Sequence, residues 1–235
     1  MSSPQRYSNG VTNVASSDPM GQLLQLDPTL TYSFFDDFHR YAATDWKITT
    51  VETGTATEVV GDEAGGVLAL TNGTADDDSD VLQLSADGGT TAMETFVIVS
   101  GKKAWMKTRC KISDKTQSEF MIGLAKADTT PLDVSDGLFF IKSDGVATLD
   151  FKTVKDSVAS TSSSLATLVN DTYVELAAYY NGKDTVEVWV DGLKEAELTS
   201  STLPTTELCV TMAVKNGEAV AKVLSIDYLL IIVER

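Results

Sequence analysis

The stretch from Tyr179 to Ala196 constrains the fold most. It includes the end of one segment and the whole of a second in which apolar and polar residues alternate. A Gly-containing pair follows each segment, Asn181-Gly182 after the first and Asp191-Gly192 after the second. Such pairs favour tight turns, because Gly and, less readily, Asn or Asp tolerate the positive φ that these turns need. The stretch therefore predicts consecutive antiparallel strands joined by short turns.

Most of the chain after residue 29 has the same character. Gly-rich clusters such as Gly65-Gly66 and Gly88-Gly89 separate the segments, and no helical stripe extends beyond about two turns. The pattern predicts strands at 31–35, 46–51, 55–60, 67–71, 81–84, 95–99, 103–112, 119–125, 138–142, 147–151, 173–180, 185–190, 194–198, 208–214 and 221–233. Many short strands with Gly-rich turns are typical of a sandwich or jelly roll. We predict an all-β, two-sheet antiparallel jelly-roll sandwich.

The N-terminal region differs from the rest. Residues 1–29 contain Pro4, Pro19 and Pro28 and show no sustained hydrophobic period. We expect an extended N-terminal arm at 1–29 and the β-sandwich domain at 30–235. Two alternatives stay open for the arm: a disordered terminus, or an arm that orders against a neighbouring subunit.

Alternation along three predicted strands places aromatic and charged side chains on polar faces. Trp105, Lys107 and Arg109 share the polar face of segment 103–112, while Tyr179 and Trp189 face outward from the following strands. Aromatic rings among charged groups suit sugar stacking, and they also suit a protein interface. These five residues are the interface or ligand-binding candidates, unless loops or the arm cover the aromatic rings.

The final apolar run, residues 228–233, does not alternate. We expect this strand to be covered on both faces, by the partner sheet and by a loop, the arm or another subunit. The run is too short to span a bilayer, and residues 1–6 resemble no secretory signal. We expect a soluble protein made in a cytoplasm.

The chain is strongly acidic, with 34 acidic and 18 basic residues and a formal net charge of −16. Such a surface repels phosphate backbones and anionic lipids, which argues against nucleic-acid and membrane partners.

Cys110 and Cys209 each lie in an apolar, strand-like run. Two readings stay open for them: two buried thiols, or a disulfide between neighbouring strands. The single histidine, His39, is expected at the surface, because no Gly-x-Ser-x-Gly nucleophile elbow accompanies it.

One acidic loop is a candidate for a metal site. Asp76, Asp78 and Asp80 could place carboxylate oxygens around a calcium ion. The loop lacks the Gly and the matched Glu of an EF-hand, so a solvated acidic loop is the alternative. We expect no other cofactor.

Three landmarks resemble the concanavalin A-like (legume lectin/glucanase, laminin-G-like) jelly-roll family. They are residues 34–38 with the following Trp46, the hairpin at 186–192, and the closing segment 224–231. The resemblance covers about residues 32–235 and implies that the first strand lies beside the last. Sugar-cleaving members carry Glu-x-Asp-x-x-Glu on one strand, so that two carboxylates can act together. That spacing is missing from this sequence, and we therefore predict that the protein is not an enzyme.

An arm, a jelly roll and no visible secretion signal also resemble virion proteins of tailed bacteriophages, above all capsid decoration or cement proteins. The resemblance implies a structural protein on the capsid surface, assembled in the host cytoplasm. Its expected partners are the major capsid protein and copies of itself, as a homotrimer. The alternative is a glycan-binding, lectin-like module of a phage fibre or host-attachment protein.

Overall fold

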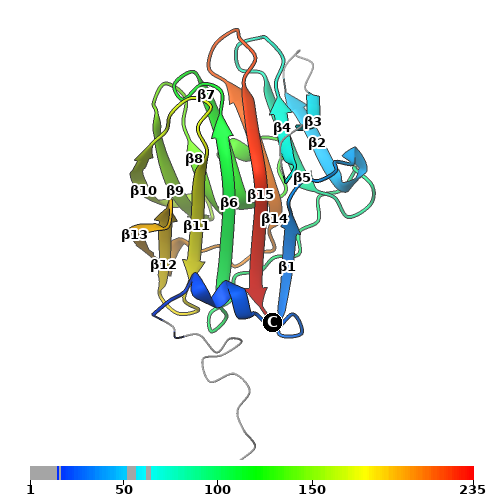
Figure 1. The fold of residues 1–235 in the computed structure, drawn as a ribbon. Helices are drawn as coiled ribbons and strands as arrows, with labels where there is room; N and C mark the ends of the chain where they lie inside the picture. The colour runs from blue at the N-terminus through cyan, green and yellow to red at the C-terminus, as the bar shows by residue number, and fades with distance from the viewer. Residues whose placement is uncertain (1–14, 16, 52–56, 62–64) are drawn as a thin grey trace, which may run out of the picture.

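The computed structural model of the chain describes residues 15, 17–51, 57–61 and 65–235. These residues form two antiparallel β-sheets packed face to face (Figure 1), which confirms the predicted fold class. Residues 1–14 and 16, half of the expected arm, lie outside the described residues, as do 52–56, which include the start of the strand predicted at 55–60.

The eight-stranded sheet has the order β13-β12-β11-β6-β15-β4-β3, and β1 also pairs with β15. Its strands are β1 (Thr31–Asp36), β3 (Thr57–Gly61), β4 (Val67–Thr71), β6 (Ala104–Ile112), β11 (Val174–Tyr180), β12 (Thr185–Val190), β13 (Leu193–Thr199) and β15 (Val223–Glu234). The β1–β15 register runs from Thr31 opposite Glu234 to Asp36 opposite Leu229. The first strand therefore lies beside the last, as the family resemblance implies.

The seven-stranded sheet has the order β10-β9-β8-β7-β14-β5-β2. Its strands are β2 (Trp46–Val51), β5 (Ser79–Leu84), β7 (Ser118–Ala125), β8 (Gly137–Lys142), β9 (Thr148–Lys155), β10 (Val158–Thr167) and β14 (Cys209–Asn216). Four short 3₁₀ helices complete the described elements: η1 (Gly21–Gln25), η2 (Ala43–Asp45), η3 (Pro131–Asp133) and η4 (Ser200–Thr202). Among the described residues, no helix is long and apolar enough to cross a membrane.

The turns predicted at Asn181-Gly182 and Asp191-Gly192 both form. Asp191 and Gly192 have φ values of 48° and 79° and make a two-residue connection between β12 and β13. The Asn181 side chain fixes the other turn, because its Oδ1 accepts the backbone N–H groups of Lys183, Asp184 and Thr185 at 2.8, 3.1 and 3.2 Å.

The main core fills the space between the sheets. Met106 and Cys110 of β6 and Val188 of β12 point inward and are fully or almost fully buried, as the alternation predicts. Phe140 and Phe151 pack edge to face on the opposite sheet, with ring centroids 4.9 Å apart. Each such side chain contributes about 1.5–3 kcal/mol by leaving water, so this layer holds the two sheets together.

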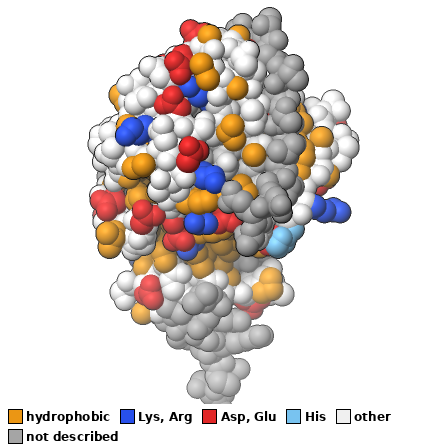
Figure 2. Space-filling view, turned by 45° about the horizontal axis from the view of Figure 1, so that its top comes forward, with side chains coloured by type: hydrophobic (Ala, Val, Ile, Leu, Met, Phe, Trp, Pro, Cys, Tyr) orange, Lys and Arg blue, Asp and Glu red, His pale blue; other side chains and the backbone are white. Residues whose placement is uncertain are grey.

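The outer face of the seven-stranded sheet has a second apolar cluster. Met121, Phe139 and Ile141 are buried there, and Leu132 of η3 packs against them. The loop that contains η3 therefore covers this cluster. On the surface shown in Figure 2, acidic and basic side chains lie beside one another rather than in separate patches.

One predicted strand is wrong, and one strand was missed. Residues 95–99 form no strand; Phe96 makes only an isolated bridge to Leu208. Strand β10 was not predicted, because its Ser-rich sequence has no apolar alternation. Cys110 and Cys209 lie in different sheets as free, buried thiols, and burial raises the pKa of each to about 12.

Candidate functional site

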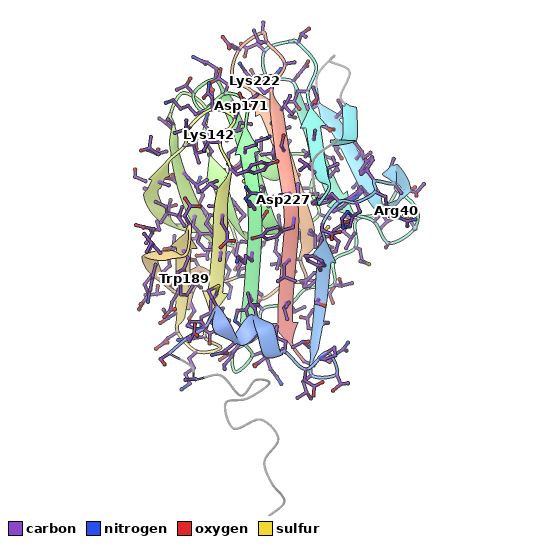
Figure 3. All side chains as sticks on the ribbon, in the orientation of Figure 1. Arg40, Lys142, Asp171, Trp189, Lys222 and Asp227 are labelled. Carbon is purple, nitrogen blue, oxygen red and sulfur yellow. The ribbon has the colours of Figure 1, made fainter. Side chains whose placement is uncertain are left out.

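The five candidate residues lie on the outer face of the eight-stranded sheet. Trp105 of β6 is directly opposite Tyr179 of β11, with ring centroids 5.5 Å apart. Two residues further along, on the same face, Lys107 is opposite Ala177, which in turn is opposite Trp189 of β12. Figure 3 shows Trp189 toward the end of the sheet that the N-terminal segment crosses.

Residues 17–26, which we call the cover segment, lie over the three aromatic rings. Trp105, Tyr179 and Trp189 are 1%, 3% and 9% exposed. Met20, Leu23 and Leu26 pack against these rings and against the buried Ile232 of β15, and the Trp105 Nε1–H donates to the Pro19 carbonyl at 3.1 Å. Part of the expected arm thus covers the aromatic candidates and the C-terminal end of the last strand.

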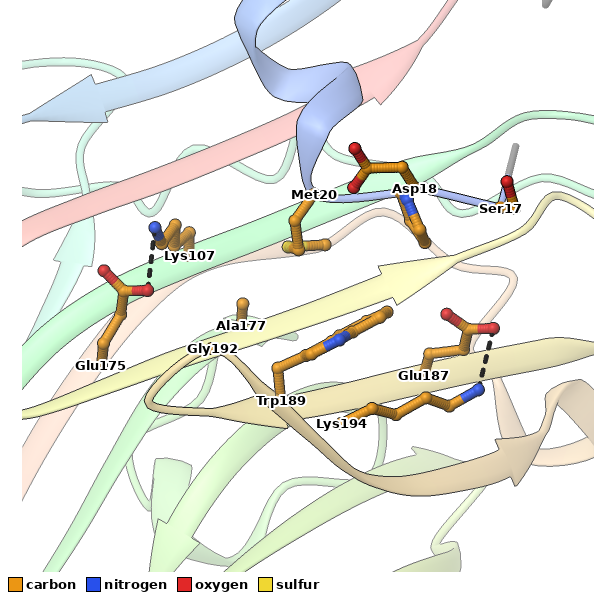
Figure 4. Close-up of a pocket in the computed structure, with 11 residues that line it drawn as sticks. Ser17, Asp18, Met20, Lys107, Glu175, Ala177, Glu187, Trp189, Gly192 and Lys194 are labelled. Atoms are coloured by element: carbon orange, nitrogen blue, oxygen red, sulfur yellow. Dashed lines mark ion pairs between the residues drawn. The ribbon is translucent and has the colours of Figure 1, made fainter. Parts of the chain in front are cut away.

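A cavity of about 380 Å³ remains between the start of the cover segment and the β12–β13 hairpin. We call it the Trp189 groove; Figure 4 shows Trp189 on one side and Met20 on the other. Its further lining includes Asp18, Lys107, Glu175, Glu187 and Lys194.

Both lysines that line the groove are paired with carboxylates. Lys107 Nζ lies 2.9 Å from Glu175 Oε1, and Tyr228 Oη donates to Glu175 Oε2 at 2.8 Å. Burial opposes ionisation of Glu175, but these hydrogen bonds outweigh it and lower the pKa of its carboxyl group. Glu175 is therefore a carboxylate that accepts hydrogen bonds and no proton donor at neutral pH.

The second charged group surrounds Lys194. Glu187 of β12 is directly opposite Glu197 of β13, a like-charge pair that would be unfavourable alone. Lys194 Nζ lies 3.0 Å from Glu187 and 2.9 Å from Glu197, and these contacts raise the lysine pKa. Sequence analysis missed Lys194, although the two-residue turn at 191–192 places it opposite Trp189.

Arg109 lies outside the groove. Its guanidinium contacts Asp227 of β15 at 2.5 Å and stacks 4.0 Å above the Tyr173 ring centroid. Figure 3 shows Asp227 in the middle of the sheet face, away from the groove. The structure thus brings Lys107 and Trp189 together in one cavity, leaves Trp105 and Tyr179 beneath the cover segment, and gives Arg109 a separate ion pair.

A second hollow, of about 400 Å³, lies on the outer face of the seven-stranded sheet. Glu119 lines it, with burial raising the pKa of its carboxyl group, and Lys215 pairs there with Asp77 at 2.7 Å. On β8 the outward positions are apolar, Phe139 and Ile141.

The calcium candidates do not converge. Asp76 is exposed, Asp78 Oδ2 accepts the Ala75 backbone N–H at 3.0 Å, and the buried Asp80 accepts the Thr50 hydroxyl at 3.3 Å. In the described part of the chain, no three His, Cys, Asp or Glu side chains are grouped as a metal site. His39 is at the surface, paired with Asp37 at 2.9 Å.

No protein-family model and no curated protein matches the chain. Among solved structures, a protein of unknown function from Shewanella oneidensis MR-1 is 16% identical, covering 94% of this chain and 95% of its own, with a TM-score of 0.59. A carbohydrate esterase from the Shiga toxin-encoding bacteriophage phi24B is 16% identical, over 86% and 97%, with a TM-score of 0.52. A glycoside hydrolase family 16 endo-glucanase from Bacteroides ovatus is 12% identical, over 84% and 99%, with a TM-score of 0.58.

The chain has the concanavalin A-like jelly-roll fold. At such identities the likeness concerns the fold alone. It nevertheless corrects one prediction: the inference that the protein is not an enzyme is wrong, because many structures with this fold are enzymes, among them glucanases, a lyase and an esterase. The missing Glu-x-Asp-x-x-Glu spacing argues only against the carboxylate-pair mechanism of glycosidases, and the same fold carries enzymes with other mechanisms.

Proposed function

We propose that the protein binds saccharides through the Trp189 groove, as a lectin-like part of a phage fibre or host-attachment protein. The observation that carries the proposal is the combination of an aromatic side chain with two groups of paired charges around one cavity. The small part of the Trp189 ring that the cover segment leaves exposed lines this cavity and can contact the C–H side of a sugar, and fixed charges offer hydrogen bonds to the sugar hydroxyl groups.

Size and charge agree with this assignment. A cavity of about 380 Å³ falls within the usual range for small-ligand sites. Its lysines are already paired with carboxylates, which leaves hydrogen-bonding groups but no excess positive charge. The groove therefore suits neutral saccharides better than uronic acids. The phage setting has two supports: the resemblance of the chain to virion proteins, and a fold shared with a bacteriophage carbohydrate esterase.

The test is affinity electrophoresis of the protein through gels that contain neutral glucans or, separately, uronic-acid polymers. We expect retardation by a neutral glucan, weakened about tenfold or more in Trp189→Ala. Tyr173→Ala is the matched control, because Tyr173 lies next to the same sheet face but outside the groove. Equal retardation of both variants, or none of the wild type by any neutral glucan, would refute the groove. Release of reducing ends during the assay would show that the protein also cleaves the polysaccharide.

A second candidate is capsid decoration, with the protein bound to the major capsid protein as a homotrimer. The observation in its favour is Phe35, which is 60% exposed on β1, a strand that pairs with β15 alone among the described strands. An exposed aromatic residue on a free sheet edge favours a protein contact. Co-sedimentation with capsid shells tests the idea, and we expect Phe35→Ser to reduce it. Unchanged co-sedimentation would contradict a contact at this edge.

A further inference from the structure

The second hollow, on the outer face of the seven-stranded sheet, is built around one row of side chains, and we call it the Glu119 hollow. The row crosses four neighbouring strands, so that each member is directly opposite the next: Val51 of β2, Ser79 of β5, Lys215 of β14 and Glu119 of β7. Because neighbouring strands lie about 4.8 Å apart, the backbones at Ser79 and Glu119 are about 10 Å apart. Asp77 and the loop that contains η3 complete the lining.

Two polar side chains of this row have no partner among the described residues. Glu119 is half-buried, and none of those residues lies within hydrogen-bond or ion-pair distance of its carboxylate. Its cross-strand neighbour Lys215 pairs instead with Asp77 at 2.7 Å. Ser79 is only 7% exposed, and its hydroxyl group, which lines the hollow, bonds to no described residue. Because buried polar groups without partners are unfavourable, both groups favour a ligand that bonds to them.

The hollow has an excess of negative charge. Asp77, Glu119 and Asp133 line it together with one basic residue, Lys215. Since Lys215 neutralises Asp77, the excess comes from Glu119 and Asp133. Burial raises the pKa of the Glu119 carboxyl group, and the nearby Lys215 opposes this shift only in part. A cation bound beside Glu119 stabilises its ionised form, and a cleft lined by one sign of charge attracts ligands of the other sign.

The cation that fits is organic. In the part of the chain that the structure describes, the acidic side chains are not grouped as a metal site. The hollow also has an apolar side, formed by the buried Val81 and by Leu132 of η3. A metal ion makes no use of such a surface, whereas the body of an organic cation packs on it. A primary ammonium group suits a single carboxylate, because it carries three donors on one compact charge.

We propose that the Glu119 hollow binds a small primary amine with an apolar body. The ammonium group donates to the Glu119 carboxylate, the body packs on Val81 and Leu132, and a hydroxyl group at the far end bonds to Ser79. The cavity of about 400 Å³ falls within the usual range for small-ligand sites. This inference goes beyond saccharide binding in the Trp189 groove and does not depend on it.

Three related probes test the assignment: tyramine, tyrosol and phenethylamine. Tyramine carries an ammonium group and a phenol hydroxyl at opposite ends of an apolar ring. Tyrosol has a hydroxyl in place of the ammonium group, and phenethylamine lacks the phenol hydroxyl. In NMR titrations of the isotope-labelled protein at neutral pH and low salt, we expect tyramine to shift the amide signals of Ser79, Lys215 and Glu119 in a saturable way. Tyrosol should bind about tenfold more weakly, because it loses a charge-assisted hydrogen bond. Phenethylamine should bind several-fold more weakly than tyramine.

Two substitutions in the hollow should act in opposite directions. Glu119→Gln should weaken tyramine binding about tenfold. Its matched control is Glu195→Gln, which removes the same charge from an exposed position on β13 in the other sheet and should leave binding unchanged. Lys215→Met should strengthen tyramine binding several-fold, because it removes a competing ammonium group and frees Asp77. Damage to the fold cannot produce that gain, so this variant tests the proposal even if Glu119→Gln is unstable.

The proposal is overturned if tyramine and tyrosol bind equally, if Glu119→Gln and Glu195→Gln bind tyramine equally well, or if Lys215→Met binds it no more tightly than the wild type. Trp189→Ala should leave tyramine binding unchanged. Loss of binding in that variant would place the amine in the Trp189 groove and refute a site at Glu119. Retardation by neutral glucans is measured separately, so the two proposals can fail independently.

Discussion

Replacement of Lys142 by Met tests how a charge is held inside the sandwich. Lys142 shares the inward face of β8 with Leu138 and Phe140 and is fully buried. Its Nζ donates to the carbonyl groups of Thr116 and Ser118, the former at 2.9 Å, and to the Ser118 hydroxyl at 3.3 Å. Burial lowers the lysine pKa from 10.5 to about 8, although nearby carboxylates oppose the shift.

The size and sign of the effect follow from linkage. Below pH 8 both the folded and the unfolded chain carry the proton, and burial of the charge costs up to about 3 kcal/mol. Between pH 8 and 10.5 the folded chain loses its proton while the unfolded chain keeps it, so the free energy of unfolding rises with pH. Above this window both states are neutral and the cost is gone.

Urea unfolding of the wild type and Lys142→Met at several pH values from 7 to 10 measures this difference. We expect the wild type to gain stability relative to the variant as the pH rises through this range. The pH slope is the readout, because the variant also leaves the Ser118 carbonyl without its lysine donor, at a cost that does not depend on pH. A constant difference between the two proteins over the whole range would refute the reasoning.

Two further predictions concern glycines and thiols. Gly123→Ala should lower the free energy of unfolding in urea by about 3 kcal/mol, because the new Cβ would lie 2.5 Å from the Leu138 carbonyl oxygen. Gly145→Ala should lower it by roughly 1 kcal/mol, because the new Cβ meets nothing within 4 Å and only the φ of 77° is strained. Equal costs would show that β7 and β8 can separate freely. Cys110 and Cys209 should not react with a thiol reagent at pH 8 until guanidinium unfolds the chain, and rapid labelling in native buffer would contradict their burial.

Local patterns carried most of the fold prediction. The alternation in β6 assigned Met106 to the core and Lys107 to the outer face, because a side-chain period of two has only two outcomes. The same rule fails for β10, an edge strand whose Ser-rich sequence needs no apolar face. Residues 95–99 have strand-like composition, yet they find no neighbouring strand beyond one bridge.

The candidate site was predictable only in part. Alternation placed Trp189 and Lys107 on one face, and the turn at 191–192 fixes Lys194 opposite Trp189. Nothing local indicates that Met20 would lie beside Trp189, because that contact joins parts of the chain far apart in sequence. Contacts of this kind depend on the assembled sheet, and a single sequence holds no period or motif that encodes them.

The pairing of β1 with β15 has a mechanical consequence. Thr31 is opposite Glu234, so the chain enters and leaves the sandwich at the same end of one strand pair. Tension applied through both ends would load the hydrogen bonds of this pair one after another, as in a zipper, and not all at once. A tether that must resist force would have to hold this protein at another point on its surface.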